Sequence, residues 1–140
     1  MKTLLLLSAA ILVAGCTSSG GASSGPPAQT QAAKDAAALA EALSGRVAGE
    51  PVDCVNERDL GGNKSYGRDV ILFTGNTGDV LYVNRPTGGC PEVGSGRALK
   101  TKITTGQLCR GDIVTVLDPV SRMELGSCAL GAFTPYRRSR

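Results

Sequence analysis

The sequence predicts a mainly β protein: a small antiparallel β-barrel or sandwich with two disulfides, preceded by a short helix and a disordered tether. Beyond residue 46, short β-forming runs alternate with Gly- and Pro-rich turns, as is typical of antiparallel sheets. Four of the five cysteines lie in that region, and an Ala-rich segment precedes it. We expect a signal peptide at 1–15, a linker at 16–31, a helix at 32–45 and a β-domain at 46–140.

The start of the chain has the features of an export signal. Lys2 precedes an apolar run at 4–13, about half the ~20 residues that a membrane-spanning helix needs. Val13-Ala14-Gly15-Cys16 follows this run. The motif resembles the lipobox of bacterial lipoproteins, which implies cleavage before Cys16 and attachment of lipid, such as palmitate, to this residue. The alternative is an ordinary signal peptide with a chance cysteine.

Lipid on Cys16 would determine where the protein works. Two or three acyl chains hold a protein on a bilayer stably, whereas a single chain holds it reversibly. The next residue is Thr17, not the Asp that favours inner-membrane retention in the lipoproteins of Gram-negative envelopes. We therefore expect a bacterial envelope protein, anchored to the outer membrane and facing the periplasm.

The composition argues against nucleic-acid binding. The formal net charge is only +3, so the chain lacks the strongly basic balance that phosphate backbones attract. Aromatic residues make up 4% of the chain and Trp is absent, so side chains that stack on bases or sugars are scarce.

The tether and the helix are distinguished by composition. Residues 17–31 are rich in Ser, Gly, Ala, Thr and Pro and bury little apolar area, which predicts disorder. Residues 32–43 are strong helix formers, and Ser44-Gly45 supplies a C-terminal stop. Leu39 and Leu43 share a face with Ala32 and Ala36. We expect a helix held loosely through its Leu face.

Alternating and apolar runs predict the strands of the β-domain. The predicted strands are residues 69–74, 79–84, 98–105, 113–117 and 124–133. The first two are joined by Gly75-Asn76-Thr77-Gly78, which predicts a hairpin. Residues 85–96 predict a loop that a bonded Cys90 would hold. Gly126 and Gly131 are candidates for bulges in the last strand.

The cysteines of the β-domain predict disulfides. An even number of cysteines in an exported chain favours pairing, and Cys54, Cys90, Cys109 and Cys128 allow three pairings. We favour Cys54–Cys128, which would join the two ends of the domain, with Cys90–Cys109. Zinc binding is disfavoured because the sequence has no C-x-x-C pair and no histidine.

Several short motifs surround these cysteines. They are Cys54-Val55, Gly89-Cys90-Pro91, Leu108-Cys109-Arg110-Gly111-Asp112-Ile113 and Ser127-Cys128-Ala129-Leu130-Gly131-Ala132-Phe133-Thr134-Pro135. Together they resemble a family of small exported proteobacterial proteins with four spaced cysteines and no assigned function. The resemblance spans roughly residues 50–135 and implies disulfide pairing and export, but no activity.

Candidate catalytic groups are few. The lack of histidine removes Ser-His-Asp and Cys-His sites. Asp112 and Asp118 flank one strand, roughly 20 Å apart along an extended chain, so we interpret them as turn residues. Gly61-Gly62-Asn63-Lys64-Ser65 lacks the spacing of a phosphate-binding loop and is interpreted as a flexible loop. Arg137-Arg138-Ser139-Arg140 is interpreted as a solvated tail, with contact to anionic lipid as the alternative.

These observations favour a membrane-anchored envelope lipoprotein that acts as a non-enzymatic binding or structural module. We predict no cofactor, metal site or catalytic residue, and we expect an envelope protein or a glycan as the partner. One alternative is an envelope hydrolase or transferase that uses carboxylates without histidine. Another is a redox protein with a labile disulfide.

Overall fold

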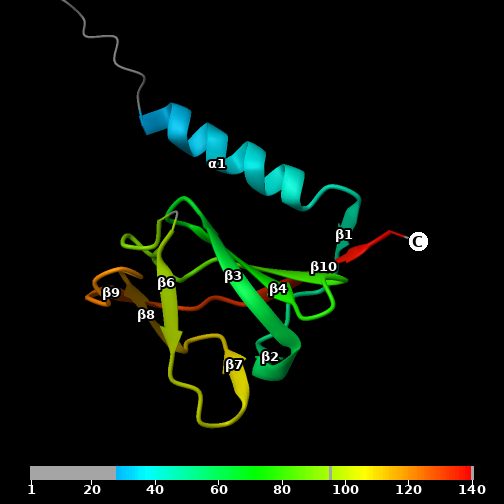
Figure 1. Cartoon of the computed structure of the whole chain (residues 1–140). Coiled ribbons are helices and arrows are strands. Elements are labelled where there is room, and N and C mark those ends of the chain that lie inside the picture. Colours follow the sequence, from blue (N-terminus) through cyan, green and yellow to red (C-terminus); the bar gives the residue numbers. More distant parts are fainter. Residues whose placement is uncertain (1–27, 95, 140) are drawn as a thin grey trace, which may run out of the picture.

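A computed structural model describes residues 28–94 and 96–139 of the chain. The predicted signal peptide, Cys16 and most of the predicted tether lie outside these residues. Helix α1 (Ala28–Ala42) comes first and is followed by strands in antiparallel sheets (Figure 1). The predicted class, a mainly β protein with one preceding helix and two disulfides, is confirmed.

The largest sheet has five strands. Its order is β1 (Arg46–Ala48), β10 (Phe133–Arg138), β5 (Val80–Asn84), β4 (Val70–Gly75) and β3 (Leu60–Tyr66). The predicted hairpin is confirmed as β4 and β5, in which Phe73 is paired with Tyr82. The last strand, β10, lies between β5 and β1, so the C-terminal segment is built into the sheet (Figure 1).

Two smaller sheets complete the domain. One contains β6 (Ala98–Thr101), β8 (Ile113–Leu117) and β9 (Glu124–Ala129), and the other contains β2 (Cys54–Asn56) and β7 (Gln107–Cys109). A short 3-10 helix, η1 (Glu57–Asp59), precedes β3. The predicted strand at 113–117 has the observed bounds, whereas the strand predicted at 98–105 ends at Thr101.

The strand predicted at 124–133 is divided in two. β9 ends at Ala129 and pairs with β8, whereas β10 begins at Phe133 and pairs with β5. Gly131 lies at the crossing between the two sheets, where an added Cβ would collide with the backbone oxygen of Arg85. Only a residue without a side chain permits this close approach. Near Gly126 the register with β8 shifts, as expected for a bulge.

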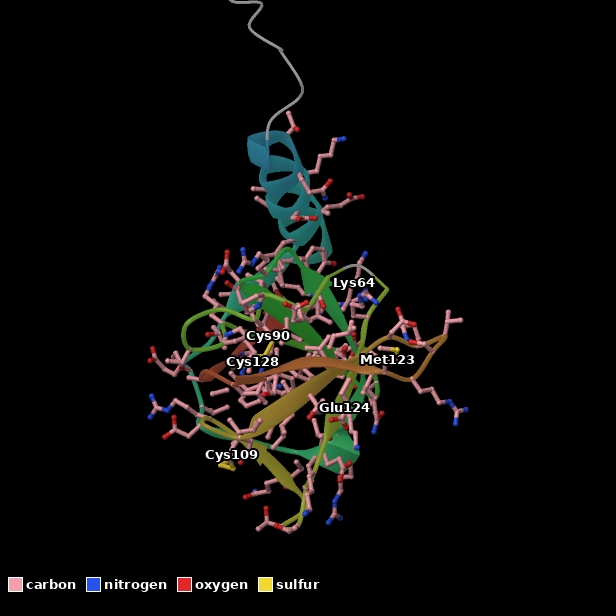
Figure 2. All side chains as sticks on the ribbon, turned by 90° about the vertical axis from the view of Figure 1, so that its left-hand side faces the viewer. Lys64, Cys90, Cys109, Met123, Glu124 and Cys128 are labelled. Carbon is pink, nitrogen blue, oxygen red and sulfur yellow. A yellow bond between two sulfur atoms is a disulfide. The ribbon has the colours of Figure 1, made fainter. Side chains whose placement is uncertain are left out.

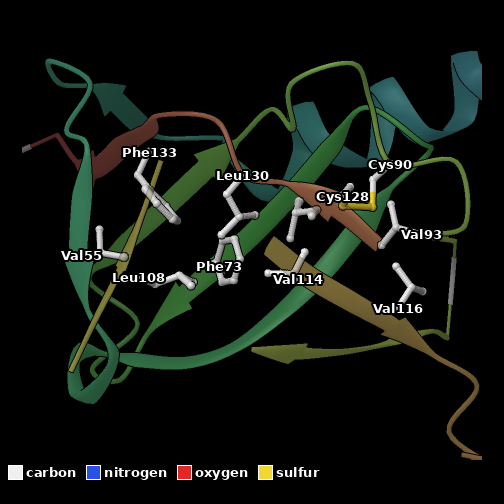
Figure 3. Close-up of a cluster of buried hydrophobic side chains, with 11 residues drawn as sticks. Val55, Phe73, Cys90, Val93, Leu108, Val114, Val116, Cys128, Leu130 and Phe133 are labelled. Carbon is white, nitrogen blue, oxygen red and sulfur yellow. A yellow bond between two sulfur atoms is a disulfide. The ribbon is translucent and has the colours of Figure 1, made fainter. Parts of the chain in front are cut away.

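The main core lies between the five-stranded and three-stranded sheets. Ile71 and Phe73 of β4 face Val114 and Val116 of β8, and all four are at most 3% exposed. Phe73 also contacts Phe133, with ring centroids 5.6 Å apart (Figure 3). Successive residues of a strand point to opposite faces, so Val70 and Leu72 point away from this core.

Helix α1 covers part of the opposite face of the large sheet. Leu39, Ala42 and Leu43 pack on a second cluster formed by β3, β4 and β5. The docking Leu face is thus present, but Ala32 and Ala36 are exposed and do not belong to it. The helix also begins at Ala28 and ends at Ala42, so the last predicted tether residues, 28–31, are helical.

The favoured disulfide pairing was wrong. The bonds are Cys54–Cys109 and Cys90–Cys128. Cys54 and Cys109 are paired directly opposite each other in β2 and β7, which brings their Cα atoms to 4.0 Å. Cys90 lies in the loop after β5, and this loop is bound to the end of β9 by the bridge between Thr87 and Ala129. The pairing of neighbouring strands and loops determines which cysteines are bonded, and the two ends of the domain are not joined by a disulfide.

Two further interpretations are corrected. The segment at 61–65, expected as a flexible loop, belongs to β3 and pairs with β4 along Asn63–Phe73 and Lys64–Leu72. Arg137 and Arg138, expected in a solvated tail, belong to β10 and pair with β1. In both cases the partner strand supplies the backbone hydrogen bonds that decide the conformation, although the segment itself has little strand propensity.

Candidate interaction surface

The loop between β8 and β9 exposes apolar side chains. Val120 is 93% exposed and Met123 is 63% exposed. We call residues 118–124 the hairpin tip. In Figure 2 Met123 lies to one side of the molecule, away from the buried Cys90–Cys128 bond. Singly scattered apolar residues are common on protein surfaces, whereas exposed apolar side chains that lie together mark candidate interaction sites.

Asp118 organises the hairpin tip. Its Oδ1 atom accepts hydrogen bonds from the backbone N–H groups of Val120, at 3.0 Å, and Ser121, at 2.9 Å. The Ser121 hydroxyl donates to the same oxygen at 3.1 Å. These N–H donors lower the pKa of Asp118 below its ordinary value, with a smaller contribution from Arg97. The charged carboxylate therefore stabilises this turn.

Backbone bonds close the same loop. The Asp118 N–H donates to the Met123 oxygen at 3.0 Å, and the Arg122 N–H donates to the Asp118 oxygen at 2.8 Å. Arg122 has φ of 59°, a left-handed conformation that no other non-glycine residue adopts within the described ranges. Such a conformation is unfavourable for a long side chain and persists only where the surroundings impose it.

Charges at the base of the tip are already paired. Arg97 forms an ion pair with Asp118, and Lys100 of β6 bonds Glu124 at 3.2 Å. Arg122 forms no ion pair with any described residue. The hairpin tip therefore presents two apolar side chains beside one cation that is available to a partner.

The predicted carboxylates serve as turn residues. Asp112 accepts a hydrogen bond from the Cys109 N–H at 2.7 Å, and Asp118 has the contacts described above. Both roles agree with the interpretation from sequence. Among residues 28–94 and 96–139, no group of three acidic or Cys side chains gathers as a metal site.

The described surface includes two open hollows of different character. One, of about 200 Å³, is lined by Asp59, Asn76 and Tyr82 among others, with Asp59 as its sole carboxylate. The other, of about 430 Å³, lies where α1 meets β1 and β10 and contains Arg46 and Arg138. The Arg46 guanidinium is held by the backbone oxygens of Gly78 and Asp79, so it braces the β4–β5 turn.

The chain is thus a small antiparallel β-protein crosslinked by two disulfides, and the two most exposed large apolar side chains among its described residues are on one hairpin. No family model, curated protein or solved structure matches it. In the part of the chain that the structure describes, no helix combines the length and apolar character required to cross a bilayer. Val120 and Met123 were not predicted from the sequence. The signal that could have found them is their place between the strands predicted at 113–117 and 124–133, in a turn that begins with Asp118-Pro119.

Proposed function

We propose that the protein is a membrane-anchored envelope lipoprotein that binds a protein partner through its hairpin tip. The anchor rests on the resemblance of Val13-Ala14-Gly15-Cys16 to a lipobox. Two disulfides agree with an oxidising compartment such as the periplasm. The observation that carries the binding role is Val120, which is 93% exposed on a turn held by Asp118.

The energetics of the tip favour binding. Complete burial of a Val or Met side chain contributes about 1.5–3 kcal/mol, so the two residues together can drive association. The hydrogen bonds of Asp118 already order the loop, which reduces the conformational entropy lost on binding. Met123 has a flexible thioether side chain that adapts to the shape of an apolar pocket.

The chemistry of the tip indicates the kind of partner. Arg122 lies between Val120 and Met123 in the chain and forms no ion pair with a described residue. An apolar pocket with a carboxylate at its rim would satisfy all three side chains. The tip has no aromatic residue to stack on sugar rings, so we favour a protein over a glycan.

Site-specific photo-crosslinking tests the binding role. A photoreactive amino acid at position 120 should give a discrete adduct with an envelope protein. The matched control is position 47, because Val47 is also apolar and is 61% exposed, but lies on β1. Adding Met123→Asp to the labelled chain should abolish the adduct. Equal adducts at positions 120 and 47, or an adduct that survives Met123→Asp, would contradict the proposal.

Fractionation of cells tests the anchor. Cys16→Ser removes the sulfur that would carry lipid, so the protein should move from the membrane to the soluble fraction. Mass spectrometry of the wild-type protein should find acyl chains on an N-terminal Cys16. If the Cys16→Ser protein stays in the membrane fraction as the wild type does, the anchor is ruled out.

A further inference from the structure

We infer that Cys54–Cys109 is a thiol–disulfide exchange site for a dithiol protein, whereas Cys90–Cys128 is a permanent crosslink. This site is separate from the hairpin tip. In Figure 2 Cys109 and Met123 lie at opposite sides of the molecule. The inference therefore does not depend on binding through the hairpin tip.

The two disulfides differ in their access to solvent. Cys90 is 1% exposed and Cys128 is 8% exposed, and both belong to the main core (Figure 3). Cys54 is exposed and Cys109 is half-buried. Exchange requires an attacking thiolate to reach a sulfur atom, so exposed disulfides are the ones that react. A reductant can reach Cys54–Cys109 in the folded protein.

Contacts other than the disulfide also hold strands β2 and β7 together. The central pair of β2 and β7, Val55 and Leu108, is buried in the main core at 6% and 2% exposure. On one side of the bond, the Arg110 N–H donates to the Asp53 oxygen at 2.6 Å, and the Arg110 guanidinium bonds the Asp53 carboxylate at 2.9 Å.

Hydrogen bonds also join the two chain segments on the other side of the disulfide. The Glu57 N–H donates to the Gly106 oxygen at 3.0 Å, and the Gln107 amide donates to Asn56 Oδ1 at 3.3 Å. None of these contacts involves a sulfur atom, so reduction of the disulfide does not remove any of them directly. They would keep two thiols opposite each other on paired strands, ready to form the bond again.

The exchange follows ordinary disulfide chemistry. A thiolate of the dithiol protein attacks Sγ of Cys54, the more exposed of the two residues, and the bond to Cys109 Sγ breaks with its electron pair leaving on Cys109 as a thiolate. The second thiol of the partner then attacks the mixed disulfide and releases Cys54. The partner is oxidised to its disulfide, and its two protons and two electrons reduce Cys54 and Cys109.

The first test uses the native full-length protein and graded glutathione buffers. Free thiols are trapped with N-ethylmaleimide and located by peptide mass spectrometry. We expect Cys54 and Cys109 to be labelled at least about tenfold faster than Cys90 and Cys128, with the far-ultraviolet circular dichroism unchanged. Equal labelling of all four, earlier labelling of Cys90 and Cys128, or labelling only as the spectrum is lost would overturn the inference.

A second test captures the intermediate. A C-x-x-C oxidoreductase whose second cysteine is replaced by Ser cannot complete the exchange, so it should remain bound as a mixed disulfide to Cys54. The matched control is Cys54→Ala/Cys109→Ala, which should fold and give no adduct. An adduct on Cys90 or Cys128 would overturn the inference. Failure of the control variant to fold would also overturn the inference, because an exchange site requires the protein to stay folded when the Cys54–Cys109 bond is absent.

Discussion

Asn84 at the end of β5 connects the two main sheets through a single side chain. It is fully buried, its Nδ2 donates to the Gly131 oxygen at 2.7 Å, and its Oδ1 accepts from the Gly131 N–H at 3.0 Å. The chain crosses from β9 to β10 at Gly131, where neither backbone group takes part in a sheet. The side-chain amide replaces the missing strand partner.

Replacement of Asn84 should therefore be costly. Asn84→Ala leaves the N–H and the oxygen of Gly131 without their partner in the interior, and each unsatisfied group costs about 1–3 kcal/mol. We expect the free energy of unfolding to fall by about 3 kcal/mol in denaturant titrations. Asn63→Ala is the control, because Asn63 is exposed on β3 and should change stability by less than about 0.5 kcal/mol. Equal effects of the two changes would contradict this role of Asn84.

Asp118 makes the stability of the hairpin tip depend on pH. Its pKa is lowered in the folded protein by the N–H donors of Ser121 and Val120. Because the pKa of Asp118 is lower in the folded protein, its carboxylate stabilises the folded hairpin tip. This stabilisation is fully present above the pKa of an unfolded Asp, near 3.9, and is lost as the pH falls through the pKa of the folded protein. Amide hydrogen exchange at Val120 and Ser121 should therefore accelerate below that pH, relative to the core strands.

A variant separates this effect from general acid unfolding. Asp118→Asn keeps the size of the side chain but removes its charge. The exchange of Val120 and Ser121 should then be faster near neutral pH and should lose its titration step. If the step persists in Asp118→Asn, another group is responsible.

At the scale of the element, helix α1 depends on its docking face. A helix of this length is marginal alone in water, so contacts of Leu39 and Leu43 with the second cluster must stabilise it. The composition of the Ala-rich segment predicted the helix, but the face that docks was determined by the sheet beneath it. Asp35 is half-buried on this side, close to Gly67, whereas Ala36 is exposed.

Removal of the two Leu side chains should release the helix. Leu39→Ala combined with Leu43→Ala keeps helix propensity but loses most of the apolar contact with the sheet. We expect the amides of α1 to lose most of their protection from hydrogen exchange, while the β4 and β5 amides keep theirs. Ala36→Gln is the matched control, because it changes an exposed position of the same helix. A helix that stays protected in the double variant would show that other contacts hold it.

For the whole molecule, the two disulfides close overlapping segments of chain. The sequence separations are 55 for Cys54–Cys109 and 38 for Cys90–Cys128. In the chain-entropy model, loops of these lengths each contribute about 4 kcal/mol, so loop length hardly distinguishes the two bonds. Their surroundings differ instead, because only Cys90–Cys128 is packed in the main core.

Paired alanine substitutions test this difference. Cys90→Ala/Cys128→Ala removes the crosslink and also leaves unfilled space in the core, which adds to the cost. Cys54→Ala/Cys109→Ala removes a crosslink that lies outside the main core. We expect the first variant to unfold at a distinctly lower temperature than the second by calorimetry. The reverse order would mean that the β2–β7 pair is the more important constraint.

The sequence by itself determined the class of the protein, the β4–β5 hairpin, β8, the helix and the involvement of four cysteines in disulfides. These features depend on local periodicity, turn residues and composition. Each of these signals is present in a short segment of sequence, independent of tertiary contacts. The expected lipid on Cys16 likewise rests on a local motif and stays a prediction.

Only the tertiary structure decided the disulfide partners, the crossing at Gly131, and the strand conformation of residues 61–65 and 137–138. It also decided which apolar side chains remain exposed at the hairpin tip. Strands β2 and β7 have three residues each, too few for a pattern to specify their register. Their pairing comes from burial of Val55 and Leu108 in a core shared with distant segments, and that long-range packing is what places Cys54 opposite Cys109.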